Sequence, residues 1–301
     1  ALKDHFGGGS WCEWEDGIRR RQPEAMAHYS GELADEIRLQ EALQYFFFSQ
    51  WQKLKQYAND KGVKIIGDIP IFVAADSADA WAHPELFEFD EDFRPIRVAG
   101  VPPDYFCATG QLWGNPLYDW ERARATKFAW WIERIQACLA MSDIVRIDHF
   151  RGFVGCWAVP ADHPTAEHGT WEPALGRELF EAVSHELGEL PIIAEDLGVI
   201  TPEVEELRDS NGFPGMKILQ FAFDSAEDND FLPHNYPANS VVYTGTHDND
   251  TSHGWYHGAS SKDKQFARDY LDATARNVAW KFIRAAWAST SVMAIAPLQD
   301  I

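Results

Sequence analysis

The sequence lacks the features that would tie a protein to a membrane or a nucleic acid. It contains no apolar run near 18 residues, so no transmembrane helix is expected. Lys and Arg together number 26 against 47 Asp and Glu, which gives a formal net charge of -21. Nucleic acids and anionic membranes attract basic patches, so neither is an expected partner. The composition suits a soluble protein that acts on a neutral ligand.

The sequence also has few cysteines and lacks the residue spacings that are typical of metal sites. No cysteine lies in a CxxC pair or beside a histidine-rich stretch, and HxH and HExxH spacings are absent. We therefore expect no metal site, and free thiols in a reducing, cytoplasmic compartment rather than disulfides. The four cysteines are Cys12, Cys107, Cys138 and Cys156.

Short β-rich runs alternate with longer helical patterns along the 301 residues. This alternation is typical of βαβ units and of a parallel sheet covered by helices. Six runs have strand composition: 63–68, 143–148, 191–195, 216–222, 240–245 and 291–296. Helical patterns cover 32–61, 121–141, 173–188, 202–210 and 261–288.

The predicted fold is an α/β protein with a (β/α)8 barrel that is incomplete at its N-terminal end, because six strands are two short of eight. The chain opens with ALKDHFGGGS, without an initiator Met or the apolar core of a signal peptide. We expect one partial catalytic barrel over 1–301, cut from a longer protein, with a helical lead-in over 1–62. A doubly wound open sheet is the competing architecture, but no glycine-rich dinucleotide fingerprint follows any strand.

Residues 82–120 are expected to form an irregular insertion loop, rich in Pro, Asp, Phe, Trp and Gly. Irregular segments of this length in a compact domain are usually functional. Aromatic rings stack on the apolar faces of sugars and amides bind their hydroxyl groups, although such a loop can also pack its own aromatic residues. Four residues supply these groups: Tyr105, Phe106, Gln111 and Trp113.

Acidic residues follow four of the predicted strands at corresponding positions: Asp68, Asp148, Glu195 and Asp248. The carboxyl ends of the strands meet at one face of a parallel barrel, where active sites lie. Converging carboxylates repel one another, so stability alone does not account for four of them. A single acid after a strand is usually a helix N-cap or a surface charge. Asp196 is expected to be such a cap or a packing partner.

Asp148 lies in the segment VRIDHFRG between Arg146 and Arg151. Residues i and i+2 of a strand share a face, so the Arg146 guanidinium should lower the pKa of Asp148. The like charges of Asp148 and Asp248 should raise the pKa of Glu195. Retaining glycosidases use such a pair of one ionised and one protonated carboxyl group. We predict that Asp148 attacks the anomeric carbon and that Glu195 is the acid and then the base.

Five segments closely resemble those of the amylomaltases: GDIPIFV, GVPPDYFCATGQLWGNPLYDW, RIDHFRG, AEDLGVITPEV and YTGTHDNDT. These are bacterial 4-alpha-glucanotransferases, related to the plant disproportionating enzyme within the wider alpha-amylase superfamily. The resemblance covers nearly the whole chain. It implies transfer of an α-1,4-glucan segment, from maltooligosaccharides, starch or glycogen, to the 4-hydroxyl of another glucan or glucose. It also implies that no metal or organic cofactor takes part.

The resemblance further implies roles for single residues. Asp148 would be the nucleophile, Glu195 the general acid/base and Asp248 the acid that stabilises the transition state. The donor sugar would be bound by Asp68, Arg146, His149 and His247. Independently of the family, His247 and Asp248 are expected to hydrogen-bond ring hydroxyls.

On the acceptor side, the resemblance implies that the loop 100–116 covers the site, with Gln111 and Trp113 touching the glucan. Cys107 departs from the family, which usually has Ser at this place. Two alternatives stay open: a hydrolase of the same superfamily, which would release glucose without disproportionation, and a glucan-binding fragment without turnover. Preferred glucan length, oligomeric state and the activity of this chain alone are not encoded in the motifs.

Overall fold

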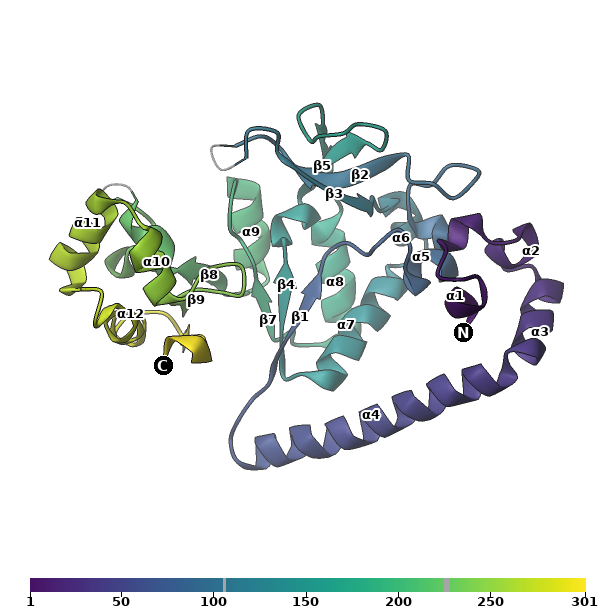
Figure 1. Cartoon of the computed structure of the whole chain (residues 1–301), viewed down its shortest axis with the longest axis horizontal. Helices are drawn as coiled ribbons and strands as arrows, with labels where there is room; N and C mark the ends of the chain where they lie inside the picture. Colours follow the sequence, from purple (N-terminus) through teal and green to yellow (C-terminus); the bar gives the residue numbers. More distant parts are fainter. Residues whose placement is uncertain (105–106, 225–227) are drawn as a thin grey trace. The chain divides into compact units, whose positions relative to one another are not determined.

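The computed structural model describes residues 1–104, 107–224 and 228–301 (Figure 1). The chain divides into two compact units, Ala1–Pro191 and Ile192–Ile301, called unit 1 and unit 2 below. Both units contain helices and parallel strands, as the alternating sequence pattern predicts.

Unit 1 begins with a helical region. Its elements are α1 (Leu2–His5), the 3-10 helix η1 (Trp11–Glu13), α2 (Asp16–Arg19), α3 (Pro23–Glu32) and α4 (Ala34–Asp60). Pro23 opens α3, where its missing N–H costs no helical hydrogen bond. Although α4 has 27 residues, no helix in the described ranges is both long and apolar enough to cross a membrane.

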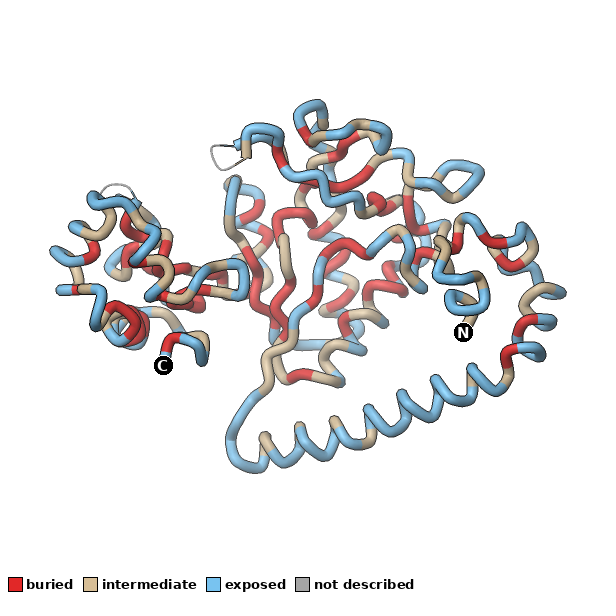
Figure 2. The backbone as a smooth tube through the Cα atoms, in the orientation of Figure 1, coloured by how far each residue is buried: buried red, intermediate tan, exposed pale blue. Residues whose placement is uncertain are grey.

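Helix α4 is exposed over nearly its whole length (Figure 2). None of its residues is buried. Its exposed large apolar side chains, called the α4 apolar surface below, are Leu39, Leu43, Tyr45, Phe46, Phe47, Phe48, Leu54 and Tyr57. Exposed apolar side chains in such number often mark places where a protein contacts something else.

Two parallel strands form the centre of unit 1. These are β1 (Ile66–Pro70) and β4 (Ile144–Asp148), paired so that Asp68 is opposite Arg146. The helices around them are α5 (Ala78–Ala82), η2 (Pro84–Leu86), α6 (Trp120–Ala125), α7 (Ala129–Met141), η3 (Phe150–Phe153) and α8 (Gly176–Leu187). The helix predicted over 121–141 is divided into α6 and α7, because Lys127 and Phe128 adopt the left-handed conformation (φ 53° and 57°).

The insertion 82–120 is more regular than its sequence suggests. It contains β2 (Arg97–Val101) and β3 (Gln111–Pro116), which join β5 (Gly155–Pro160) and β6 (Thr170–Pro173) in an antiparallel sheet of order β3-β2-β5-β6. A register shift between Val98 and Gly100 breaks the period-two pattern by which such strands are recognised. Gly100 is required there, because a Cβ would lie 2.4 Å from the carbonyl oxygen of Gln111.

In unit 2, β8 (Gly215–Ile218), β9 (Ser240–Tyr243) and β10 (Met293–Ile295) form a parallel sheet of order β10-β9-β8. The Ala194 N–H at the end of β7 (Ile192–Ala194) donates to the Pro214 carbonyl. The remaining elements are α9 (Pro202–Ser210), η4 (Leu219–Phe223), η5 (Pro233–Asn235), α10 (Ser252–Gly258), α11 (Ser261–Leu271), α12 (Val278–Trp287) and η6 (Leu298–Asp300).

Two helix boundaries in unit 2 follow from single residues. Helix α9 begins at Pro202, as the helical pattern over 202–210 predicts, and proline is favoured at this first helical position. The pattern over 261–288 predicts one helix, but Asp272 adopts the left-handed conformation (φ 55°) and separates α11 from α12.

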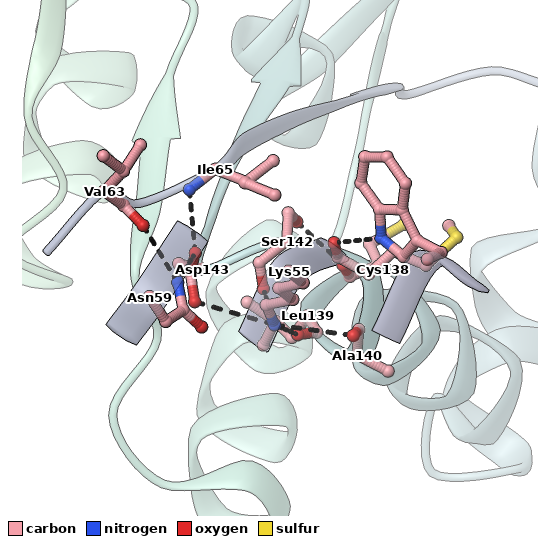
Figure 3. Close-up of polar contacts among 11 residues, drawn as sticks. Lys55, Asn59, Val63, Ile65, Cys138, Leu139, Ala140, Ser142 and Asp143 are labelled. Carbon is pink, nitrogen blue, oxygen red and sulfur yellow. Dashed lines mark hydrogen bonds and ion pairs between the residues drawn. The ribbon is translucent and has the colours of Figure 1, made fainter. Parts of the chain in front are cut away.

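Three polar side chains join α4 to the end of α7 and the start of β4 (Figure 3). The Trp51 indole N–H donates to the Met141 carbonyl at 2.7 Å. The Lys55 ammonium lies 2.9 Å from the Ser142 carbonyl oxygen, and 3.3 and 3.4 Å from those of residues 139 and 140. These carbonyls end a helix and have no helical N–H partner, so a positive charge beside them is stabilising.

The same contact region fixes where the strands begin. Asp143 Oδ2 accepts hydrogen bonds from the Ile65 N–H at 2.7 Å and from the Asn59 amide at 2.9 Å. The hydrogen bond from the Ile65 N–H is the main cause that lowers the pKa of Asp143. Ile65 precedes β1 and Asp143 precedes β4, so this carboxylate connects the two strands just before their first residues.

Replacing Lys55 with Met should lower the free energy of unfolding by about 1–3 kcal/mol, because the carbonyls at the end of α7 lose their cationic partner. Lys53→Met is the matched control, since Lys53 lies on the same helix and is exposed. Urea denaturation of both variants measures the difference. Equal stabilities for the two variants would show that the Lys55 contacts contribute nothing.

Candidate active site

In unit 1 the guanidinium of Arg146 lies between two carboxylates. Its Nη1 is 2.8 and 2.9 Å from the two oxygens of Asp68, and its Nη2 is 2.7 Å from Asp148 Oδ1. The parallel register produces this arrangement, because Asp68 is opposite Arg146 and Asp148 follows two residues later on the same face. Arg146 is 9% exposed, whereas Asp68 and Asp148 are 49% and 45% exposed. A buried cation therefore holds two carboxylates that a ligand can reach.

Two details of this cluster differ from the sequence prediction. Asp68, predicted to end its strand, lies in the middle of β1, which continues to Pro70. Arg151 does not flank Asp148. Its guanidinium lies 3.8 Å from the ring centre of Trp171, and its Nε and Nη1 are buried without a hydrogen-bond partner among the described residues. The cause is the turn after β4, where His149 is left-handed and η3 carries Arg151 away from the strand direction.

His149 connects this cluster to strand β3. Its ring meets the Trp113 ring edge to face, with centroids 4.7 Å apart, and the Trp113 indole N–H donates to Gln111 Oε1 at 3.1 Å. Burial lowers the pKa of His149 to about 4; the charge of Arg151 acts in the same direction and that of Asp148 opposes it. The imidazole is therefore neutral at neutral pH and can both donate and accept a hydrogen bond.

The loop before β3 is described only in part. Tyr105 and Phe106 lie outside the described residues. Cys107 is described: its N–H donates to Asp104 Oδ1 at 2.8 Å, and its thiol donates to the Gly110 carbonyl at 2.9 Å. A serine hydroxyl would be a stronger donor to the same carbonyl, because a thiol is a weak hydrogen-bond donor.

In unit 2, Glu195 directly follows β7 and is buried. Its Oε1 accepts from the Leu197 N–H at 2.9 Å. The neighbouring Asp196 is a packing partner, as expected: it accepts from the Met216 N–H at 2.7 Å and forms an ion pair with Arg208. Asp196 thus connects the end of β7 to β8 and α9, and these contacts fix the backbone position of the adjacent Glu195.

His247 and Asp248 lie in the loop between β9 and α10. They are 69% and 72% exposed, and His247 Nε2 is 3.5 Å from Asp248 Oδ2. The loop has its own hydrogen bonds: Asn249 Oδ1 accepts from the N–H and the hydroxyl of Thr246, both at 2.9 Å. Asp248 is five residues beyond the end of β9, so this loop rather than the strand orients its carboxylate.

Within unit 1 the structure thus brings together six predicted residues: Asp68, Gln111, Trp113, Arg146, Asp148 and His149. They offer two accessible carboxylates, a neutral imidazole, an amide and an indole face, which suit a neutral ligand rich in hydroxyl groups. Among the described residues, no group of three or more His, Cys, Asp or Glu is placed to hold a metal ion. The stacking of Arg151 on Trp171 was not foreseen, because no local pattern relates the two residues.

A family model described as 4-alpha-glucanotransferase matches residues 1–301. The 4-alpha-glucanotransferases of Synechocystis sp. and Thermus thermophilus are 54% and 50% identical to this chain over its full length. A chloroplastic/amyloplastic 4-alpha-glucanotransferase of Arabidopsis thaliana is 45% identical, again over the full chain. The chain spans 60%, 62% and 52% of the lengths of these three relatives.

Among solved structures, the amylomaltase from Streptococcus agalactiae in complex with acarbose superposes with a TM-score of 0.96 at 46% identity, covering 100% of this chain and 61% of that one. The amylomaltase from Corynebacterium glutamicum matches with a TM-score of 0.72 at 18% identity, over 84% of this chain and 41% of that one, which is a likeness of fold alone. The expectation of an α/β fold, part of a (β/α)8 barrel, is confirmed by the first match.

Replacing His149 with Gln should make stability less sensitive to acid. The pKa of His149 is lowered from 6.5 to about 4, so between these values the unfolded chain binds more protons and the wild type loses stability as the pH falls. The variant has no such histidine and does not lose this stability. The unfolding free energy of the variant minus that of the wild type, measured by denaturant titration, should therefore increase when the pH is lowered from about 7 to about 5. His168→Gln, at an exposed histidine of unit 1, is the control. The same pH dependence in both variants would contradict the assignment.

Proposed function

Because the chain belongs to the 4-alpha-glucanotransferase family, we propose that it transfers α-1,4-glucan segments to the 4-hydroxyl of an acceptor glucan or glucose by a retaining double displacement. The observation that carries the proposal is the Arg146 guanidinium bonded to both Asp68 and Asp148 at the end of β4. It provides an oriented, accessible carboxylate at the position where a barrel enzyme keeps its catalytic groups.

Asp148 is the proposed nucleophile. Arg146 holds one of its oxygens at 2.7 Å, which orients the other oxygen for attack on the anomeric carbon. Attack forms a glycosyl-enzyme ester bond and breaks the bond to the leaving glucan, which takes its proton from Glu195. Glu195 then removes the proton from the acceptor 4-hydroxyl, whose oxygen displaces Asp148 and restores the α configuration. In retaining glycosidases the two carboxyl groups are about 5–5.5 Å apart.

The remaining residues bind the sugars. Asp248 stabilises the oxocarbenium-like transition state, and Asp68, His149 and His247 hydrogen-bond the hydroxyls of the donor ring. Neutral His149 suits this role, because it binds a hydroxyl without adding a charge beside Arg146.

The insertion is the proposed acceptor side. Water competes with the acceptor at every turnover, so transfer requires that the acceptor be bound and oriented and that water be excluded. The partly exposed Trp113 ring, held by Gln111, offers a stacking surface beside His149. We assign an acceptor-binding role to Tyr105 and Phe106 as well, because their sequence positions fall in the loop 100–116 that is proposed to cover the site.

For the protein as a whole, the proposed substrates are α-1,4-glucans. The proposed reaction uses no metal or organic cofactor. The chain forms the catalytic part of the barrel, with 1–62 as helical lead-in and 82–120 as insertion. A cytoplasmic location is supported by the cysteines, which are all unpaired.

Incubation of the chain with maltotriose tests the function. Transfer produces longer and shorter maltooligosaccharides together, which chromatography by chain length resolves. Asp148→Asn and Glu195→Gln should each lower kcat about a thousandfold or more, because each removes a group that the chemical steps require. Asp162→Asn, at an exposed position, is the control. Glucose without longer products would instead indicate a hydrolase. Binding without turnover would indicate a glucan-binding fragment.

Replacing Trp113 with Ala should raise the ratio of hydrolysis to transfer several-fold. The truncated side chain no longer stacks the acceptor, so water reaches the glycosyl-enzyme more often. Reducing-end release and transfer products from maltotriose give the ratio, and Trp171→Ala, an exposed tryptophan that contacts Arg151 instead, is the control. An unchanged ratio in Trp113→Ala would count against an acceptor role.

A further inference from the structure

Asp300 is a buried carboxylate that connects both ends of the loop carrying His247 and Asp248. Its Oδ2 accepts from the Thr244 hydroxyl at 3.0 Å and from the Ser252 hydroxyl at 2.6 Å, and its Oδ1 accepts from the Ser252 N–H at 2.7 Å. Thr244 directly follows β9 and Ser252 begins α10. One side chain therefore holds the place where the loop leaves the sheet and the place where it enters the helix.

The burial of this carboxylate is costly unless its oxygens are satisfied. No cation lies within ion-pair distance of Asp300 among the residues that the structure describes, so the three hydrogen bonds supply the compensation. Thr244 and Ser252 are themselves fully buried, which leaves their hydroxyls no water to bind. The N–H of Ser252 has no acceptor within its own helix, since it lies in the first turn. Each group thus depends on the others.

The loop is braced between these anchors. The Gln220 amide donates to the Asp250 carbonyl at 2.8 Å. A Cβ at Gly245 would lie 2.5 Å from the same amide nitrogen, so the backbone passes close to the Gln220 side chain. With both ends of the loop held and Gln220 bonded to Asp250, the exposed side chains of His247 and Asp248 project from an anchored backbone.

We propose that Asp300 is a positioning residue that orients the Asp248 carboxylate through this loop. The inference rests on the proposed function, in which Asp248 stabilises the transition state. Asp300 touches no reacting atom. It acts by keeping Asp248 oriented before the substrate arrives, which avoids reorganisation during the reaction.

The test compares Asp300→Asn with Asp143→Asn in the full chain. Asp143 is the matched control, because its carboxylate also accepts a main-chain N–H and a side-chain donor but lies at the opposite end of β4 from Asp148. In Asp300→Asn one acceptor oxygen becomes an N–H donor that faces other donors. We expect kcat for maltotriose to fall about ten- to a hundredfold, with KM changed less than about twofold. Amide hydrogen exchange over 245–251 should accelerate.

Asp143→Asn should lower stability while leaving kcat and the exchange of 245–251 unchanged. Thr244→Val and Ser252→Ala each remove a single hydroxyl group and are used in case Asp300→Asn fails to fold. Each should lower kcat and accelerate amide exchange over 245–251 less than Asp300→Asn does. In the Asp300→Asn background Thr244→Val should add no further loss.

Two results would overturn the inference. The first is that amide exchange over 245–251 is unchanged in Asp300→Asn. The second is that Asp143→Asn, with an equal loss of stability, lowers kcat as much as Asp300→Asn does. If the wild-type chain makes no transfer products, the proposed function fails. The exchange measurement then still decides whether Asp300 holds the loop.

Discussion

The parallel pairing of β1 with β4 is the constraint on which the rest of unit 1 depends. A slip of one residue would turn Arg146 away from Asp68, so the buried guanidinium would lose this carboxylate and keep only Asp148 of its own strand. Removing one partner of a buried charge is far more costly than losing a contact between exposed groups. At the opposite end of the strands, Lys55, Asn59 and Asp143 join α4 and α7 to the residues that precede the ladder.

The acidic residues of this chain serve different purposes. Asp143, Asp196 and Asp300 accept main-chain N–H groups close to the ends of strands or helices. Asp148 and Asp248 are substantially exposed, and we assign chemistry to them. Glu195 combines both properties, because it is buried and accepts the Leu197 N–H, and we assign the proton transfers to it. A net charge of -21 does not reveal these differences, whereas the contacts and exposure of each carboxylate do.

Local patterns in the sequence predict the parallel strands and most helices, because periodicity and end signals are properties of neighbouring residues. They miss β2 and β3, where a register shift and Gly100 break the alternation. In unit 1, the contact of Arg146 with Asp148 follows from their i, i+2 spacing. Its contact with Asp68 and the stacking of Arg151 on Trp171 join segments distant in the chain, so only the folded backbone reveals them. The roles of Asp148 and Glu195 follow from the charges predicted around them, whereas the transition-state role of Asp248 is implied by the family resemblance.

The α4 apolar surface has a thermodynamic consequence. Helix α4 buries none of its own residues, yet it carries aromatic side chains such as Phe46 and Phe47. A partner that binds these side chains only in their native helical arrangement would stabilise the native chain by an amount that grows with the logarithm of the partner's concentration. An unfolding midpoint measured in the presence of such a partner would be a property of the solution as well as of the fold.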